Sequence, residues 1–167
     1  MFAFYNKHDN TLYNKLVDLS RNIFFYKNLG LKDKFETRII LIFYHFSILL
    51  IIFKNKKNTK FPQSIFDNIF LNIEYHMREL GYGDIAVNKK MKTLNKIFYD
   101  ILLKLEIKEH KKFKINHNII IEHLDLNKDE KLDIISKISE YLEDFYNFCF
   151  ELDDKIMIKG LINFKFK

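Results

Sequence analysis

Glycine, proline and tryptophan are scarce or missing in this sequence of 167 residues, which holds four glycines, one proline and no tryptophan. Sandwiches and barrels of β-strands need many tight turns, and glycine, proline and asparagine–glycine pairs form most of them. Because so few of these residues are present, the composition argues against an all-β fold and favours helices. The length suits one domain with one hydrophobic core, so we expect a single domain over residues 1–167.

Cysteine occurs once, at Cys149, which excludes an intrachain disulfide and fits a reducing compartment. The opening stretch MFAFYNKHDN lacks a charged segment followed by an apolar one, so we expect no cleavable signal. The net charge of +6 permits an acidic partner, such as nucleic acid, the ribosome surface or anionic lipid. Lysine, asparagine, isoleucine and phenylalanine are also the residues that an AT-rich genome favours, so part of this charge can be compositional drift.

The longest apolar run extends from Ile39 to Phe53 and is shorter than a typical membrane span. It also contains His45 and Ser47, which are uncommon in a lipid environment. A helix that is apolar on every face is typical of the centre of a globular core. We therefore predict a buried central helix here rather than a transmembrane segment, and leave a peripheral membrane contact open.

Apolar residues at spacings of three and four predict further long helices. One begins near Pro62 and ends at Gly81, and the next carries a seam from Val87 to Leu105. Between them, Gly81 suits the left-handed position that ends a helix, and Asp84 is a candidate N-cap. A last long helix repeats the seam between residues 135 and 152. The sequence thus predicts an all-α, compact single-domain bundle of about six helices around a central apolar helix.

Sequence motifs of catalysis and of metal binding are missing. There is no phosphate-binding Walker loop, no nucleophile elbow, no HExxH, no CxxC and no histidine pair at i, i+4. Gly81, Gly83 and Ala86 match a loose dinucleotide fingerprint, but that fingerprint follows a strand, and a helix is predicted before this one. We therefore predict a protein that is not an enzyme and has neither a metal site nor a cofactor.

Two sets of polar residues stand out on the predicted helices. Arg38 and His45 are seven residues apart on one face of the apolar helix, which predicts a buried polar pair with hydrogen bonds inside the core. Lys89, Lys92 and Lys96 lie opposite the apolar seam of their helix. They form either a solvated face or an electrostatic docking surface.

Gly81 and Gly83 are two of only four glycines in the chain and lie within the motif MRELGYGD, residues 77–84. In so glycine-poor a sequence, this pairing indicates a requirement of the backbone for glycine. The pattern leaves open whether the requirement serves folding or binding.

The segment FDNIFLNIEYHMRELGYGDIAVNKKMKTLNKIFYDIL, residues 66–102, resembles the central signature of the ubiquinol–cytochrome c chaperone family without gaps. A weaker resemblance extends upstream, where Arg38 and His45 fall at the positions of an arginine and a histidine of the family. Ile40 stands where the family has an acidic residue, and Asn88 where it has a glycine. The matching positions of the central segment are Phe66, Asp67, Phe70, Arg78, Glu79, Gly81, Gly83, Asp84, Val87, Lys89, Lys92, Phe98 and Tyr99.

The resemblance implies an all-helical assembly chaperone for the cytochrome bc complex that has no cofactor of its own. It implies newly made cytochrome b as client, with the ribosome surface or a small partner protein as further partners. The expected place is the cytoplasm, at the inner face of the membrane, or the matrix if the protein is mitochondrial. An apolar groove beside the turn at 82–92 would shield the client, and a basic face would dock a partner. The alternative is a general ribosome- or RNA-binding adaptor without a membrane client. The expected binding residues are Arg78, Glu79, Gly81, Gly83, Asp84, Lys89, Lys92 and Lys96.

Overall fold

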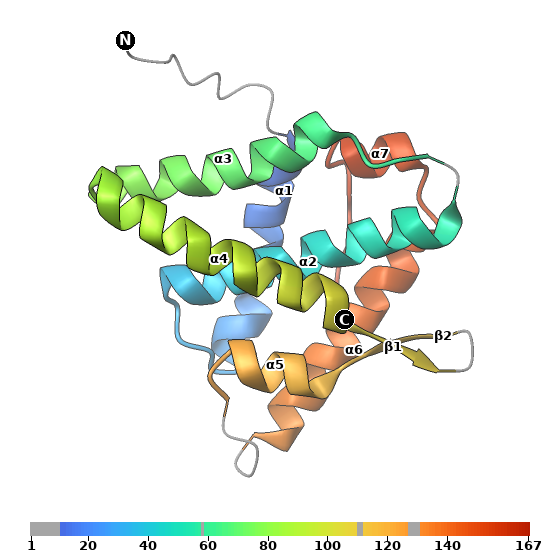
Figure 1. Ribbon diagram of the computed structural model, residues 1–167. Helices are drawn as coiled ribbons and strands as arrows, with labels where there is room; N and C mark the ends of the chain where they lie inside the picture. Colours follow the sequence, from blue (N-terminus) through green and yellow to red (C-terminus); the bar gives the residue numbers. More distant parts are fainter. Residues whose placement is uncertain (1–10, 58, 110–111, 127–130) are drawn as a thin grey trace.

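The helix α2, Phe35–Lys56, runs through the centre of the computed structural model, which describes residues 11–57, 59–109, 112–126 and 131–167 (Figure 1). Every residue from Ile39 to Leu49 is buried. Length and hydropathy would also allow this helix to cross a membrane, but 72% of its most apolar 18-residue window is buried inside the fold. The prediction of a central apolar helix is confirmed, because the other helices cover all of its faces.

Four other long helices surround α2. They are α1 (Thr11–Ser20), α3 (Gln63–Glu79), α4 (Asp84–Lys104) and α6 (Leu132–Phe150). The helices α1, α4 and α6 pack closely along α2, and α3 packs against α1 and α4 and also touches α2 through aromatic rings, with the ring of Phe66 5.6 Å from that of Phe46. Because α3 and α4 are joined by a short turn, they form a helical hairpin that projects from one side of the fold (Figure 1).

Short elements complete the fold: the π-helical turn η2 (Phe24–Asn28) and the helices α5 (His117–His123) and α7 (Asp154–Ile158). The described part of the chain thus holds seven α-helices, which confirms the all-α class. The sequence predicted about six helices and missed α7, because five residues are too few to show a helical period.

A β-hairpin was not predicted from the basic stretch 108–118. Its strands are β1 (Glu106–Glu109) and β2 (Lys112–Ile115), paired antiparallel with Glu106 opposite Ile115. Ile115 is buried, and the ring of Phe113 stacks on that of Tyr146 in α6 at 3.9 Å. The side chains of Phe113 and Ile115, two residues apart on one face of β2, therefore hold the hairpin against the fold. Two apolar residues among several lysines are too few to indicate a strand in the sequence.

The C-terminal segment packs back along the fold. The rings of Phe164 and Phe166 lie 5.4 Å and 5.2 Å from that of Tyr141 in α6. The segment starts at Gly160, whose φ of +69° turns the chain beside the backbone of Thr11 in α1. The last residues therefore cover α6 and η2, and Gly160 fixes where they begin.

Candidate functional site

The turn between α3 and α4 is closed by backbone hydrogen bonds. Gly81 has a φ of +94°, and its N–H donates to the carbonyl of Arg78 at 3.0 Å. The N–H of Tyr82 donates to the carbonyl of Met77 at 3.2 Å. This pair of bonds is the Schellman arrangement, which requires a left-handed residue where Gly81 stands. The requirement for glycine at this position is therefore one of folding.

Gly83 differs from Gly81. Its φ is −73°, which any residue adopts, and an added Cβ would meet nothing within 4 Å. Gly83 is also the N-cap of α4, since its carbonyl accepts the N–H of Val87 at 2.9 Å. The prediction of Asp84 as the N-cap is wrong, because Asp84 is already the first helical residue. The backbone of the free protein does not require glycine at position 83.

Arg78 fastens the end of α3 to the start of α4. Its guanidinium donates to the carboxylate of Glu74, one turn earlier in α3, at 3.0 Å, and to the carboxylate of Asp84. These two carboxylates raise the pKa of Arg78. Arg78 and Asp84 therefore have a structural partner in each other, whereas Glu79 beside them is exposed.

Substitutions at the two glycines should show at which position the free energy of unfolding depends on glycine. Gly81→Ala should lower the free energy of unfolding by about 1 kcal/mol or more, because an L-residue is strained at this φ. Gly83→Ser should raise it by a few tenths of a kcal/mol, since serine caps a helix somewhat better than glycine. Urea unfolding of both variants measures the two changes. Equal losses in the two variants would contradict the distinction.

The three predicted lysines lie on a face of α4 that is turned to solvent. Lys89, Lys92 and Lys96 are all exposed, and none of them forms an ion pair within the described residues. Three apolar side chains extend the same stripe at spacings of three and four. They are Ile85, Tyr99 and Leu103, whose exposed fractions are 87%, 50% and 81%. We call these six residues the outer face of α4.

The apolar ends of the outer face were missed by the sequence prediction. The signal was present in the sequence, because Ile85 lies four residues before Lys89 and Leu103 lies four after Tyr99. The apolar groove beside this turn stays a prediction, and residues 82–92 line none of the cavities described here.

Tyr82 and Lys90 hold the turn against the rest of the fold. The ammonium group of Lys90 lies 4.8 Å from the centre of the Tyr82 ring and 3.9 Å from the Glu36 carboxylate near the start of α2. A cation over an aromatic ring is attracted by the ring's quadrupole. Lys90 thus has partners inside the fold, unlike the lysines of the outer face.

Arg38 and His45 do not form a buried pair, so that prediction is corrected. Arg38 is partly exposed, and its guanidinium pairs with the carboxylate of Asp33 at 2.7 Å. His45 is fully buried between the carbonyl of Leu41, 2.6 Å from Nδ1, and the hydroxyl of Tyr141, 2.8 Å from Nε2. Arg38 lies in the first turn of α2 and reaches the preceding loop, which the helical spacing alone could not show.

One group of side chains could hold a metal ion by geometry. Asp100 in α4 and Glu122 and His123 in α5 bring ligand atoms within 4.8 Å of one another. Lys104, however, lies 2.5 Å from the Asp100 carboxylate, and the Nε2 atom of His123 lies 2.9 Å from it. These two contacts lower the pKa of Asp100, the lysine having the larger effect. Asp100, Lys104 and His123 therefore form a polar contact between α4 and α5, in which Lys104 supplies the positive charge.

A comparison with protein families finds one match. The model described as Ubiquinol-cytochrome C chaperone matches residues 27–112. This range contains α2, α3, α4 and the turn with every predicted binding residue. Searches of the curated proteins and of the solved structures give no significant match.

Proposed function

Because this chain belongs to the ubiquinol–cytochrome c chaperone family, we propose that it assists the assembly of the cytochrome bc complex by binding newly made cytochrome b. The outer face of α4 and the adjoining turn provide the binding surface. The activity is binding rather than catalysis, in keeping with a family of chaperones. Its place is the inner face of the membrane, or the matrix side in a mitochondrion.

The observation that carries this proposal is the mixed character of the outer face. Ile85 and Leu103 are almost fully exposed in the described structure, although a folded protein gains by burying such side chains. The three lysines between them form no ion pair with any carboxylate in the described part of the chain. Exposed apolar residues around unpaired cations favour a protein partner that supplies both apolar and acidic groups.

The alternative is a general ribosome- or RNA-binding adaptor, which the same lysines favour. Phosphate contacts make the affinity for RNA fall steeply with salt. A protein client that also covers Ile85 and Leu103 would keep much of its binding when the salt concentration is raised. Retention of co-purifying cytochrome b in a high-salt wash therefore supports the client, and its loss together with RNA supports the adaptor.

The direct test replaces Lys89 and Lys92 by glutamate. Both side chains are exposed and have no ion-pair partner among the residues the structure describes, so the free energy of unfolding should change by about half a kcal/mol or less. Cytochrome b should nevertheless accumulate to a lower level in cells, because the charge of the docking surface is reversed. Immunoblots of membranes and thermal unfolding of the purified variant measure the two quantities.

The matched control is Lys165→Glu/Lys167→Glu, which makes the same change of net charge at two exposed lysines of the C-terminal segment. It should leave cytochrome b at the wild-type level. If Lys89→Glu/Lys92→Glu unfolds the protein, the lysines are structural. A stable variant with normal cytochrome b would refute the docking role of this face.

A further inference from the structure

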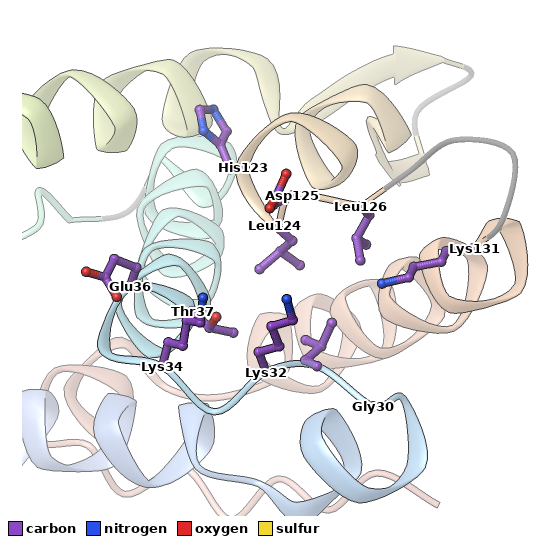
Figure 2. A pocket seen from close by; sticks show the side chains of 11 residues that line it. Gly30, Lys32, Lys34, Glu36, Thr37, His123, Leu124, Asp125, Leu126 and Lys131 are labelled. Carbon is purple, nitrogen blue, oxygen red and sulfur yellow. The ribbon is translucent and has the colours of Figure 1, made fainter.

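A cavity of about 300 Å³ lies between the start of α2 and the end of α5 (Figure 2), and no residue of the outer face of α4 is among its described lining. Leu31, Leu124 and Leu126 form an apolar wall, and Leu31 and Leu126 are buried. Sites for small ligands usually have this size or more and combine an apolar lining with a few polar groups. The proposed chaperone function makes no use of this cavity.

Three lysines line the cavity: Lys32 and Lys34 before α2, and Lys131 before α6. Figure 2 shows the side chains of Lys32 and Lys131 extending into the same space from two sides, beneath Leu124 and Leu126. No described carboxylate forms an ion pair with any of the three. Ammonium groups that share a concave space repel one another, and an anion between them removes that repulsion.

The other charged groups that the structure describes around the cavity have partners elsewhere or lie apart from the lysines. Glu36 pairs with Lys90 at 3.9 Å, and its side chain points away from the cavity (Figure 2). His123 is engaged with Asp100 outside the cavity. Among the described lining residues Asp125 is the remaining carboxylate, and Figure 2 shows it beside α5, on the far side of Leu124 from Lys32. Counted over the described lining residues, the lysine side of the cavity therefore carries positive charge.

The first turn of α2 adds to this charge. Lys34 is its N-cap and makes no side-chain capping bond, so the first amides of this 22-residue helix have no cap. Thr37 in the same turn also lines the cavity and brings a hydroxyl group. The N-terminus of a helix carries a partial positive charge and free N–H groups that favour anions, phosphate above all.

From this geometry we propose that the cavity binds a phosphate group, held by Lys32, Lys34 and Lys131 at the start of α2. Several cations and uncapped amides suit an anion that has more than two oxygens and can carry two negative charges. A phosphate group meets both conditions, and a carboxylate meets neither. The leucine wall leaves room for an apolar substituent next to the phosphate. The group can belong to a soluble phosphate ester or to a lipid headgroup, and both sources present the same chemistry.

Two binding experiments with the full chain test this site. In the first, inorganic phosphate is titrated into the protein at constant ionic strength, and backbone NMR shifts are followed in residues 30–37. In the second, flotation measures binding to phosphatidylcholine vesicles with and without phosphatidic acid. Binding in the first experiment assigns a soluble source, and binding to phosphatidic acid vesicles alone assigns a lipid headgroup. Either result supports the site.

The variant Lys32→Glu/Lys131→Glu should weaken the observed binding about tenfold or more, since two charge-assisted contacts are lost. The control Lys165→Glu/Lys167→Glu makes the same change of net charge and should bind like the wild type. If circular dichroism shows that the glutamate variant does not fold, Lys32→Met/Lys131→Met replaces it, because methionine keeps the apolar part of the lysine side chain. The site is refuted if the wild type binds neither probe, or if the cavity variant and the control lose binding equally. Cytochrome b accumulation is tested separately on α4, so either proposal can fail alone.

Discussion

Gly160→Ala should lower the free energy of unfolding by about 3 kcal/mol, within the range of strained or overpacked substitutions. Gly160 has a φ of +69°, and an added Cβ would lie 2.6 Å from the carbonyl oxygen and 2.9 Å from the carbonyl carbon of Thr11. Both are backbone atoms, so no side-chain rotation relieves the contact. The C-terminal segment would have to move away from α1 and loosen its aromatic contacts with α6.

Gly30→Ala is the matched control for this prediction. Gly30 has nearly the same φ, +71°, but an added Cβ would meet nothing within 4 Å. The free energy of unfolding of this variant should fall by only about 1 kcal/mol, which is the cost of holding an L-residue in the left-handed region. The difference between the two variants in urea unfolding isolates the close approach of the two backbone segments. Equal losses would mean that the C-terminal segment does not rest on α1.

His45 should make the stability of the fold depend on pH. Burial lowers its pKa from the usual 6.5 to about 4, against the opposing effect of the hydrogen bond with Leu41. The neutral ring donates from Nδ1 to the carbonyl of Leu41 and accepts the hydroxyl proton of Tyr141 at Nε2. The bond from Tyr141 therefore depends on the ring staying neutral, whereas the bond to Leu41 would also form from a protonated ring.

The sign of the effect follows from where the proton binds. Above pH 6.5 the ring is neutral in both the folded and the unfolded chain, so this stabilising contribution is complete. Between pH 6.5 and about 4 the unfolded chain takes up a proton that the folded chain rejects, so stability falls as the pH falls. The loss over this window is about 3 kcal/mol.

The comparison with His45→Gln measures this contribution. Glutamine does not titrate and keeps a polar group near the hydroxyl of Tyr141. The difference in free energy of unfolding between wild type and variant should change by about 3 kcal/mol between pH 7 and pH 4, in favour of the variant at low pH. Carboxylates that titrate in both proteins cancel in this difference. A difference that is the same at both pH values would show that His45 is not buried as a neutral ring.

Much of the candidate site could be predicted from the sequence, because it depends on neighbours along the chain. The spacing of Lys89, Lys92 and Lys96 places them opposite an apolar seam, and the structure finds all three exposed. The turn at Gly81 ends α3 through two local bonds, from Gly81 to Arg78 and from Tyr82 to Met77. Gly83 looked equivalent in the sequence, but its φ and the open space around it show that it is not.

The sequence by itself determined the all-α class, the central apolar helix and the exposed lysines of α4. These features follow from composition and from periods of three and four residues, which are local properties of the chain. Only the tertiary structure decided which groups meet across long separations. Tyr141 reaches His45 from 96 residues away, and the cavity joins residues 30–37 to residues 123–126 and to Lys131. No local sequence pattern predicts these long-range contacts, because they depend on how whole helices pack against one another.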